Sequence, residues 1–186
     1  WDLGDMKSLG KRYGHKKRVW AFDFAPDGER FATGSDDQTV RIWEFSSQKT
    51  IRTIELDAPV RFVRFSPDGA SLLTATADPR GWQFPGRLQL WSLSSGKLVT
   101  ELRGHEVAVN AAVFSPDGKE LTSCDANGMV SRWNAITGEQ LESLSHPFGL
   151  SHAGLLGRQG FMAMRRFSNG ILLIKGDSLT PVSEFD

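Results

Sequence analysis

Short runs of alternating apolar and polar residues make up most of this chain. Val19–Phe24 alternates large apolar side chains with small or polar ones, the pattern of a β-strand with one packed face. Pro26–Gly28 then favours a turn, because proline presets φ, aspartate can bond its own backbone and glycine accepts positive φ. Three further strands are predicted at 29–35, 39–43 and 49–54. No segment has sustained helical periodicity, so the pattern predicts short antiparallel strands and no helices.

The same strands and turns recur along the chain. An aromatic residue, a small residue and Pro-Asp-Gly precede a tryptophan that closes a strand in three copies: Phe24–Gly28 with Trp43, Phe65–Gly69 with Trp91, and Phe114–Gly118 with Trp133. A further tryptophan, Trp1, opens the chain. The period of roughly forty residues marks a repeat architecture. Because four short antiparallel strands in such a period form one blade, the predicted fold class is an all-β propeller of four-stranded antiparallel blades.

Glycine-histidine pairs stand ahead of two units. Gly14-His15 precedes the first predicted strand and Gly104-His105 precedes the third unit, in register with the turns and the tryptophans. In this combination the chain resembles the WD-repeat (WD40) β-propeller family over residues 1–145. The resemblance implies that each blade is tied by a side-chain network of a histidine, a serine or threonine, an aspartate and the tryptophan. Carried onto the first unit, the network consists of His15, Ser35, Asp37 and Trp43.

The other units keep only parts of this network. The third has His105 and Trp133, but Asn127 stands at the turn position of the aspartate. The second keeps Trp91 and has Leu56-Asp57-Ala58 in place of the glycine-histidine pair. We therefore expect the full network in the first unit alone. A buried indole N–H and a buried imidazole need hydrogen-bond partners, so we assign these histidines a structural role.

The repeats divide the chain into units. We expect residues 1–13 to end a truncated preceding blade, with blades at 14–56, 57–103 and 104–145 and a degenerate blade at 146–186. No tryptophan marks that last unit, in which strands are predicted at 150–155, 161–164, 171–174 and 179–185 with a turn at 168–170. Because the chain begins inside a unit, we expect an incomplete arc from a longer protein, prone to associate through its uncovered sheets. A closed ring of four blades is the alternative.

Charge and cysteine content narrow the range of partners. Lys and Arg number 22 and so do Asp and Glu, so no overall field attracts nucleic acid or an anionic membrane. The single cysteine, Cys124, permits no disulfide within the chain and falls in a predicted strand, where a buried thiol is expected. No segment approaches the apolar length that crosses a bilayer. The compartment stays open, although the absence of a signal peptide and of disulfides favours the cytoplasm.

Signals of catalysis are missing from the sequence. It has no Gly-x-Ser-x-Gly elbow, phosphate-binding glycine loop, His-Glu-x-x-His motif or paired cysteine ligands, and the spacing of His146 and His152 does not suit a metal. We therefore predict no enzyme activity, no catalytic residues, no metal and no cofactor. The alternative is a catalytic propeller, a hydrolase or lactonase-like enzyme, with carboxylates converging on its channel. Asp23 and Glu106 are the candidates for that role, each without an identifiable partner.

Two tryptophans lie outside the structural position. Trp20 follows the first apolar residue of its strand, and in similar propellers this position lies on the top face, where the first strands begin around the central channel. Arg61 and Asn110 are its equivalents, and Arg18 precedes it by two residues. Because tryptophan and arginine dominate interface hot spots, these residues form a candidate peptide-binding patch. The alternative is that Trp20 packs between neighbouring blades.

The second unit carries an insertion that holds the other tryptophan. Residues 78–87 lengthen the connection between its second and third strands, which emerges on the top face, and two prolines restrict it. Its candidate anchors are Arg80, Trp82, Phe84 and Arg87. The alternative is a loop that folds its aromatic residues onto its own blade. The basic run 11–18 enters the same face, either as a solvated loop or as a means of steering an acidic peptide.

These features together predict a non-catalytic protein-interaction scaffold. Its composite top face would bind a protein or peptide partner whose identity the sequence does not give, and its flanks would meet the remaining blades of the parent propeller. Nucleic acid is disfavoured, because no basic stripe with stacking aromatic residues accompanies the top-face positions.

Overall fold

The computed structural model describes residues 14–146, 150–156, 160–165, 171–175, 179 and 181–185. Every regular element within these ranges is a β-strand, and the strands form four-stranded antiparallel sheets in which sequence neighbours pair. The all-β fold class predicted from the alternation and the turns is confirmed. The predicted end of a preceding blade, residues 1–13, and the predicted turn at 168–170 lie outside the described residues.

The strands follow the repeat of the sequence. The first sheet contains β1 (Val19–Phe24), β2 (Arg30–Ser35), β3 (Thr39–Glu44) and β4 (Thr50–Glu55). The second contains β5 (Val60–Phe65), β6 (Ser71–Thr76), β7 (Leu88–Ser92) and β8 (Leu98–Leu102). The third contains β9 (Val109–Phe114), β10 (Glu120–Asp125), β11 (Met129–Asn134) and β12 (Gln140–Ser145). The fourth contains β13 (Leu150–Leu156), β14 (Gly160–Arg165), β15 (Ile171–Lys175) and β16 (Pro181–Phe185).

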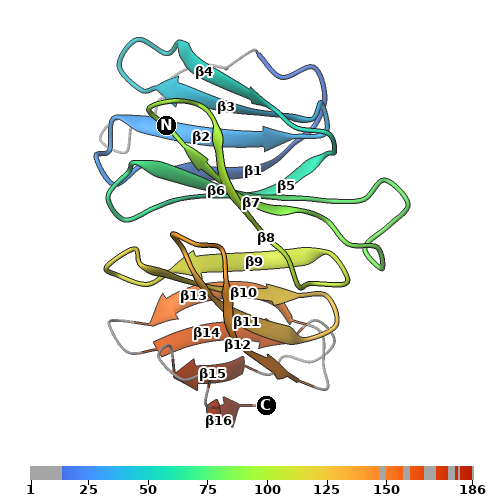
Figure 1. Cartoon of the computed structure of the whole chain (residues 1–186). Helices are drawn as coiled ribbons and strands as arrows, with labels where there is room; N and C mark the ends of the chain where they lie inside the picture. The colour runs from blue at the N-terminus through green and yellow to red at the C-terminus, as the bar shows by residue number, and fades with distance from the viewer. Residues whose placement is uncertain are drawn as a thin grey trace.

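The sheets follow one another in chain order, with the first and the fourth at opposite ends, so the ring of blades is not closed (Figure 1). The first strand of each sheet contacts the first strand of the next, in the order β1, β5, β9 and β13. The first strands begin, and the second and third strands are connected, on the side that lies to the right in Figure 1. We call this side the top face.

Apolar side chains between adjacent sheets form the core. One cluster joins the first sheet to the second and includes Val40, Ile42, Val60, Val63 and Leu72. Another joins the second sheet to the third and includes Leu73, Leu88, Ala112, Leu121 and Trp133. Because burial of apolar surface is the main favourable term in folding, each sheet depends on its neighbour for stability.

The first strand of the first sheet lacks such a covering. Phe24 is 57% exposed, whereas Phe65 and Phe114, at the same place in β5 and β9, are 5% and 4% exposed. Phe22 is 70% exposed and Val19 is 47% exposed. The preceding sheet covers the equivalent side chains of β5 and β9, and no described residue takes that place beside β1. An uncovered apolar strand of this kind favours association.

Candidate functional site

A chain of hydrogen bonds joins a tryptophan to a carboxylate in the first sheet. The indole N–H of Trp43 donates to Thr33 Oγ1 at 2.8 Å, and His15 Nε2 lies 2.7 Å from the same oxygen. His15 Nδ1 lies 3.0 Å from Asp37 Oδ2. A neutral imidazole that donates from Nδ1 and accepts at Nε2 fits both contacts, so that Thr33 donates to the histidine while it accepts from the indole. These contacts support a structural role for His15.

Asp37 collects several of these hydrogen bonds. Thr39 Oγ1 donates to its carboxylate at 2.7 Å and the Lys16 amide does so at 2.8 Å. Burial would raise the pKa of this carboxyl, but the hydrogen bonds from Thr39, Lys16 and His15 outweigh it and hold the pKa well below its ordinary value. The ionised carboxylate therefore fastens the loop before β1 to the turn between β2 and β3.

Thr33, and not Ser35, is the hydroxyl that joins the histidine to the tryptophan. Ser35 Oγ donates to the Lys17 carbonyl and accepts from the Asp37 amide, at the far end of the network. The reason is the register of the sheet. Phe31 pairs with Trp43, so Thr33, two residues along β2 on the same face, lies diagonal to the indole. The middle position that the sequence analysis gave to Ser35 is thus corrected to Thr33.

The third sheet holds a complete network as well. The indole N–H of Trp133 donates to Ser123 Oγ at 2.8 Å, and His105 Nε2 lies 2.7 Å from that oxygen. His105 Nδ1 lies 2.8 Å from Asp125 Oδ2. The carboxylate therefore comes from the end of β10, two residues before the exposed Asn127 that fills the turn position. The expectation of a full network in the first unit alone is overturned.

Trp91 in the second sheet forms the tryptophan–hydroxyl hydrogen bond of the network. Its indole N–H donates to Thr74 Oγ1 at 3.0 Å, and no glycine-histidine pair precedes this sheet. The hydroxyl occupies one position in all three sheets, two residues after the residue that pairs with the tryptophan. This diagonal is the sequence signal that identifies Thr33, Thr74 and Ser123.

The glycine before each histidine lets the incoming loop lie against the indole. A Cβ on Gly14 would stand 2.6 Å from Cη2 of Trp43, and one on Gly104 would stand 3.0 Å from Cη2 of Trp133. Any side chain there would displace the ring. The glycine-histidine pair is thus one unit, in which the first residue makes room and the second makes the hydrogen bonds.

The predicted patch on the top face is centred on Trp20, which is 48% exposed. The guanidinium carbons of Arg18 and Arg61 lie 5.0 Å and 4.7 Å from the centre of its indole ring, within cation–π range. Arg61 also forms an ion pair with Asp36, and hydrogen bonds from Arg61 and Trp20 lower the pKa of that carboxyl. Trp20 therefore contacts the neighbouring sheet through Arg61 and still offers about half of its surface to solvent.

The inserted connection between β6 and β7 is held by its own arginine and by the chain around it. Arg80 Nη2 lies 2.7 Å from Asp78 Oδ2, and the hydrogen bonds from Arg80 lower the pKa of Asp78 to about 2. The guanidinium carbon of Arg80 lies 4.1 Å from the centre of the Phe84 ring. Arg87 Nη1 lies 2.7 Å from Asp57 Oδ2 in the connection between β4 and β5. The loop therefore has a defined conformation.

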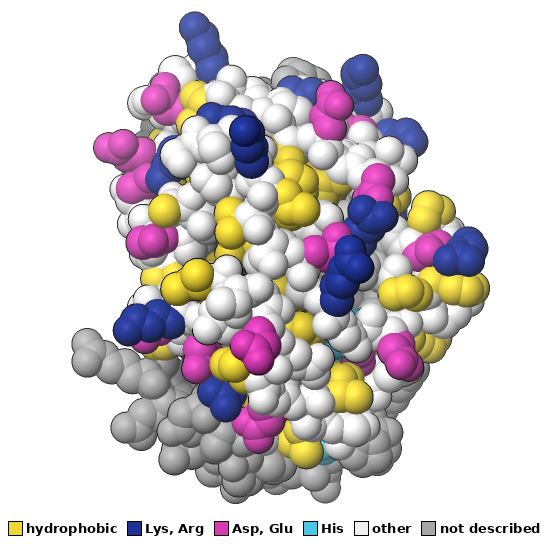
Figure 2. Space-filling view, in the orientation of Figure 1, with side chains coloured by type: hydrophobic (Ala, Val, Ile, Leu, Met, Phe, Trp, Pro, Cys, Tyr) yellow, Lys and Arg dark blue, Asp and Glu magenta, His cyan; other side chains and the backbone are white. Residues whose placement is uncertain are grey.

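Trp82 stands at the tip of this connection and is 49% exposed. Its carbonyl accepts a hydrogen bond from the Ala108 amide at 3.0 Å, immediately before β9. Figure 2 shows hydrophobic, basic and acidic side chains close together on the right-hand edge, where Figure 1 places this loop. The insertion therefore joins the second and third sheets on the top face and leaves a large aromatic ring accessible.

The predicted residues thus fall into two groups on one face. One group consists of Trp20, Arg61 and Asn110, the second residues of β1, β5 and β9. These first strands of successive sheets lie side by side, and Asn110 is partly buried. The loop forms the other group. Three carboxylates that no motif of the sequence indicates, Asp36, Asp57 and Asp78, each pair with one predicted arginine. Aspartates in turns are common, so only their place beside the arginines distinguishes them.

The sequence also raised the questions of a metal site, a membrane-spanning segment and the basic run 11–18. In the part of the chain that the structure describes, no group of three or more His, Cys, Asp and Glu side chains could hold a metal ion. No helix in those ranges is long and apolar enough to cross a membrane. Lys16 and Lys17 of the basic run are exposed, whereas residues 11–13 of that run and the side chain of His152 lie outside the described residues.

Repeated four-stranded antiparallel sheets, the first three of which hold a tryptophan hydrogen-bonded to a hydroxyl of the second strand, define a protein of the β-propeller class. A family model for the WD domain, G-beta repeat, matches residues 6–44 and 96–134. The chain belongs to the WD-repeat β-propeller family.

Two curated relatives of the chain carry one name. The chain is 28% identical over 157 residues to eukaryotic translation initiation factor 3 subunit I of Vanderwaltozyma polyspora, covering 77% of this chain and 45% of that protein. It is 31% identical over 157 residues to the subunit of the same name from Aspergillus terreus, covering 80% of this chain and 46% of that protein. The chain spans about half the length of the curated relatives it matches.

Proposed function

We propose that this chain is part of a non-catalytic scaffold that binds another protein through its top face. The observation that carries the proposal is Trp20, an indole held by Arg18 and Arg61 yet about half exposed at the start of β1. Trp82 presents a second exposed indole on the same face. Tryptophan and arginine are the residues most enriched in interface hot spots.

The partner that we propose is a protein subunit of a translation initiation complex. The relatives carry the name of a translation initiation factor subunit, and their similarity to this chain extends over most of its length. The remaining blades of the parent propeller would pack against the first sheet, where Phe22 and Phe24 are exposed. The charge balance, 22 basic and 22 acidic residues, gives no reason to add nucleic acid.

The geometry of the loop favours binding over a purely structural role. The hydrogen bond from the Ala108 amide to the Trp82 carbonyl and the ion pair of Arg87 with Asp57 join the loop to neighbouring segments in the absence of a partner. A loop that is already ordered loses less conformational entropy on binding. The two contacts therefore make the exposed Trp82 a ready anchor.

Alanine at Trp20 or Trp82 tests this proposal. In the intact protein, each variant should weaken binding to an initiation-factor subunit that is first isolated by co-purification, by roughly 2 kcal/mol or more, about thirtyfold in Kd. Isothermal titration calorimetry measures the affinity, and thermal unfolding measures stability. Trp43→Ala, by contrast, should destabilise the fold by roughly 3–5 kcal/mol.

The matched control is Ile136→Ala. Ile136 is 73% exposed in the turn between β11 and β12, away from the top face, so its loss should leave the affinity unchanged. If Trp82→Ala unfolds the protein and leaves partner affinity untouched, the loop is a packing element and the proposed surface is refuted.

A further inference from the structure

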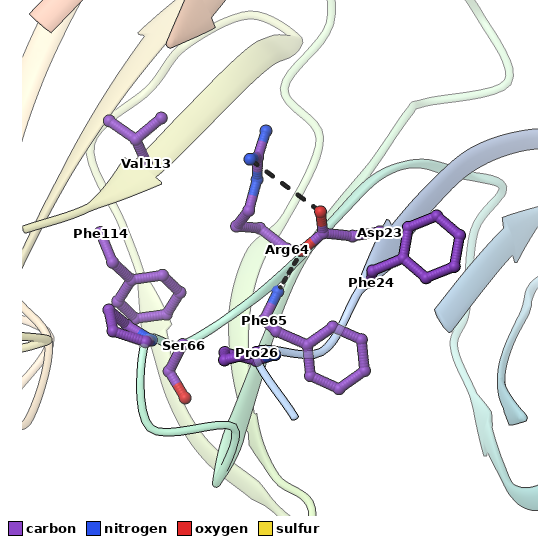
Figure 3. A pocket seen from close by; sticks show the side chains of 9 residues that line it. Asp23, Phe24, Pro26, Arg64, Phe65, Ser66, Val113 and Phe114 are labelled. Atoms are coloured by element: carbon purple, nitrogen blue, oxygen red, sulfur yellow. Dashed lines mark hydrogen bonds and ion pairs between the residues drawn. The ribbon is translucent and has the colours of Figure 1, made fainter. Parts of the chain in front are cut away.

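A pocket opens where the ends of β1, β5 and β9 meet (Figure 3). Its walls are mostly apolar and come from three successive sheets, through Phe24, Pro26, Phe65, Pro67, Val113 and Phe114. Two charged side chains enter it, Asp23 from β1 and Arg64 from β5. Both stand near the ends of their strands, whereas Trp20 and Arg61 stand near the starts, so the pocket is separate from the top-face patch.

Asp23 uses only part of its hydrogen-bonding capacity. Its Oδ2 accepts the Phe65 amide at 2.8 Å, which ties the first sheet to the second. Its Oδ1 lies 4.0 Å from Arg64 Nη1, longer than a hydrogen bond. Burial raises the pKa of this carboxyl, and the Phe65 amide, the charge of Arg64 and the Phe24 amide offset that rise only in part. One carboxyl oxygen therefore faces the pocket with an acceptor position to spare.

Arg64 has donors to spare. Its guanidinium carbon lies 5.6 Å from the centre of the Phe62 ring, within cation–π range. Its Nε is buried and makes no hydrogen bond to any residue that the structure describes. A buried donor without an acceptor costs free energy, whereas the Arg64 side chain as a whole is 39% exposed, so its terminal nitrogens can donate to a group in the pocket. In Figure 3 Arg64 and Asp23 lie next to each other, joined by a dashed line, with Val113 on the opposite side of Arg64.

We propose that this pocket binds a peptide segment through a neutral carboxamide side chain, asparagine or glutamine, placed between Arg64 and Asp23. A carboxamide carries a carbonyl oxygen that accepts from the guanidinium and an adjacent N–H that donates to the free carboxyl oxygen. The apolar part of the segment packs on the phenylalanines and prolines of the walls. A carboxylate would also accept from Arg64, but it would face the carboxylate of Asp23 at close range, and like charges repel.

The pocket-lining residues that the structure describes do not form the carboxylate pair of a hydrolase. Among the described residues that line the pocket, Asp23 is the sole carboxyl group, so the paired carboxylates of the hydrolytic alternative are not assembled there. A single carboxyl and a single guanidinium between apolar walls suit recognition by hydrogen bonding. The site is independent of the proposed top-face function.

A matched pair of small probes tests this inference. Saturation-transfer difference NMR compares 3-phenylpropionamide with 3-phenylpropionate, which share their shape and differ in the amide. The amide should give the stronger signal, with an affinity at least about tenfold higher. Arg64→Met should remove the amide signal, because the variant keeps the apolar stem and lacks the donors. Arg64→Lys keeps the charge, lacks the planar fork and should weaken the signal too.

The control is the same change at another arginine. Arg61→Met alters the top face and should leave the probe signal unchanged, and circular dichroism confirms that each variant is folded. Equal or stronger binding of 3-phenylpropionate would make the pocket an anion site and overturn the proposal. So would the absence of binding by the amide, or an equal response of the Arg64 and Arg61 variants. None of these readouts involves the initiation-factor partner, so the two proposals fail separately.

Discussion

Thr33 and Ser123 each serve two buried partners at once. Each hydroxyl accepts from an indole N–H and lies within 2.7 Å of a histidine nitrogen. Deleting such a hydroxyl leaves both the indole N–H and the imidazole nitrogen without a hydrogen-bond partner, because neither group can reach water instead. The hydroxyl is therefore a more sensitive point of the network than its place in the sequence suggests.

Thr33→Val keeps the shape of the side chain and removes the hydroxyl. We expect it to lower the free energy of unfolding by about 2–3 kcal/mol, since the imidazole and the indole are both left unpaired. Urea denaturation measures the change. Thr53→Val, at an exposed position of β4 outside the network, makes the same substitution as a control and should stay within about 0.5 kcal/mol of the parent. Equal effects of the two substitutions would contradict the network.

The carboxylate of Asp37 gives the first sheet a dependence on pH. Its pKa in the folded protein lies below the ordinary value of 3.8, so its contribution to stability is present above that value and is lost as pH falls through the folded pKa. We expect the parent to lose stability faster than Asp37→Asn below about pH 5. Urea midpoints measured from pH 7 to pH 3 check this, and parallel curves for the two proteins would disprove it.

The residues of the networks could be predicted from the sequence only in part. His15 and Trp43 stand at motif positions, and both lie in the hydrogen-bonded chain of the first sheet. Asp125 escaped prediction because a carboxylate can approach the histidine either from the turn, as Asp37 does, or from the end of the second strand. The partners of Arg61 and Arg80 escaped because ion pairs depend on how connections fold, which no strand pattern encodes.

At the scale of the element, the turns between third and fourth strands share one backbone conformation. Gln48, Gly96 and Gly138 occupy the same place in three sheets, with φ of 60°, 71° and 76°. Only glycine adopts this left-handed conformation without a steric cost. A Cβ on Gly138 would also press on Thr100 of β8, so that glycine serves the contact between sheets as well as the turn.

Gly138→Ala separates these two roles when it is compared with Gly28→Ala. Gly28 has a φ of 71°, and no described atom lies within 4 Å of the place that a Cβ would take, so alanine there should cost about 1 kcal/mol of backbone strain alone. Gly138→Ala should cost about 1 kcal/mol more, because Thr100 must also move. Thermal unfolding of both variants gives the difference. Equal losses would mean that the Thr100 contact carries no energy.

The strands and turns of the first three units follow the sequence closely, because period-two alternation and Pro-Asp-Gly turns act locally. The course of the inserted loop does not follow from local rules. Its pairing with Asp57 and its hydrogen bond to Ala108 join segments of other sheets, and they form only once the sheets are stacked. Long-range contacts of this kind are absent from any local pattern.

At the scale of the whole molecule, the series of sheets ends on an apolar strand. Val19, Phe22 and Phe24 form a stripe on β1 that remains exposed, whereas Phe65 and Phe114, the counterparts of Phe24, are buried in β5 and β9. Such a surface is a strong site for association of this chain with itself or with a further sheet.

Replacement of both phenylalanines tests this feature. Phe22→Ser with Phe24→Ser should reduce self-association of the purified chain and its binding of a hydrophobic dye, with a loss of stability below about 1 kcal/mol because both side chains are largely exposed. Sedimentation velocity and dye fluorescence measure the two effects. Ile136→Ser, at a residue that is 73% exposed elsewhere, serves as the control and should change neither. Unchanged association in the double variant would place the contact on another surface.

Cys124 offers a way to time the opening of the molecule. It is the chain's single cysteine, it packs in a cluster with Val113, Val130 and Leu179, and burial raises the pKa of its thiol to about 12. A thiol reagent at neutral pH can therefore react only when the cluster around Cys124 opens. The rate of labelling then measures the rate of that local opening. The exposed thiol of an Asn127→Cys variant would react without any opening and give the reference rate.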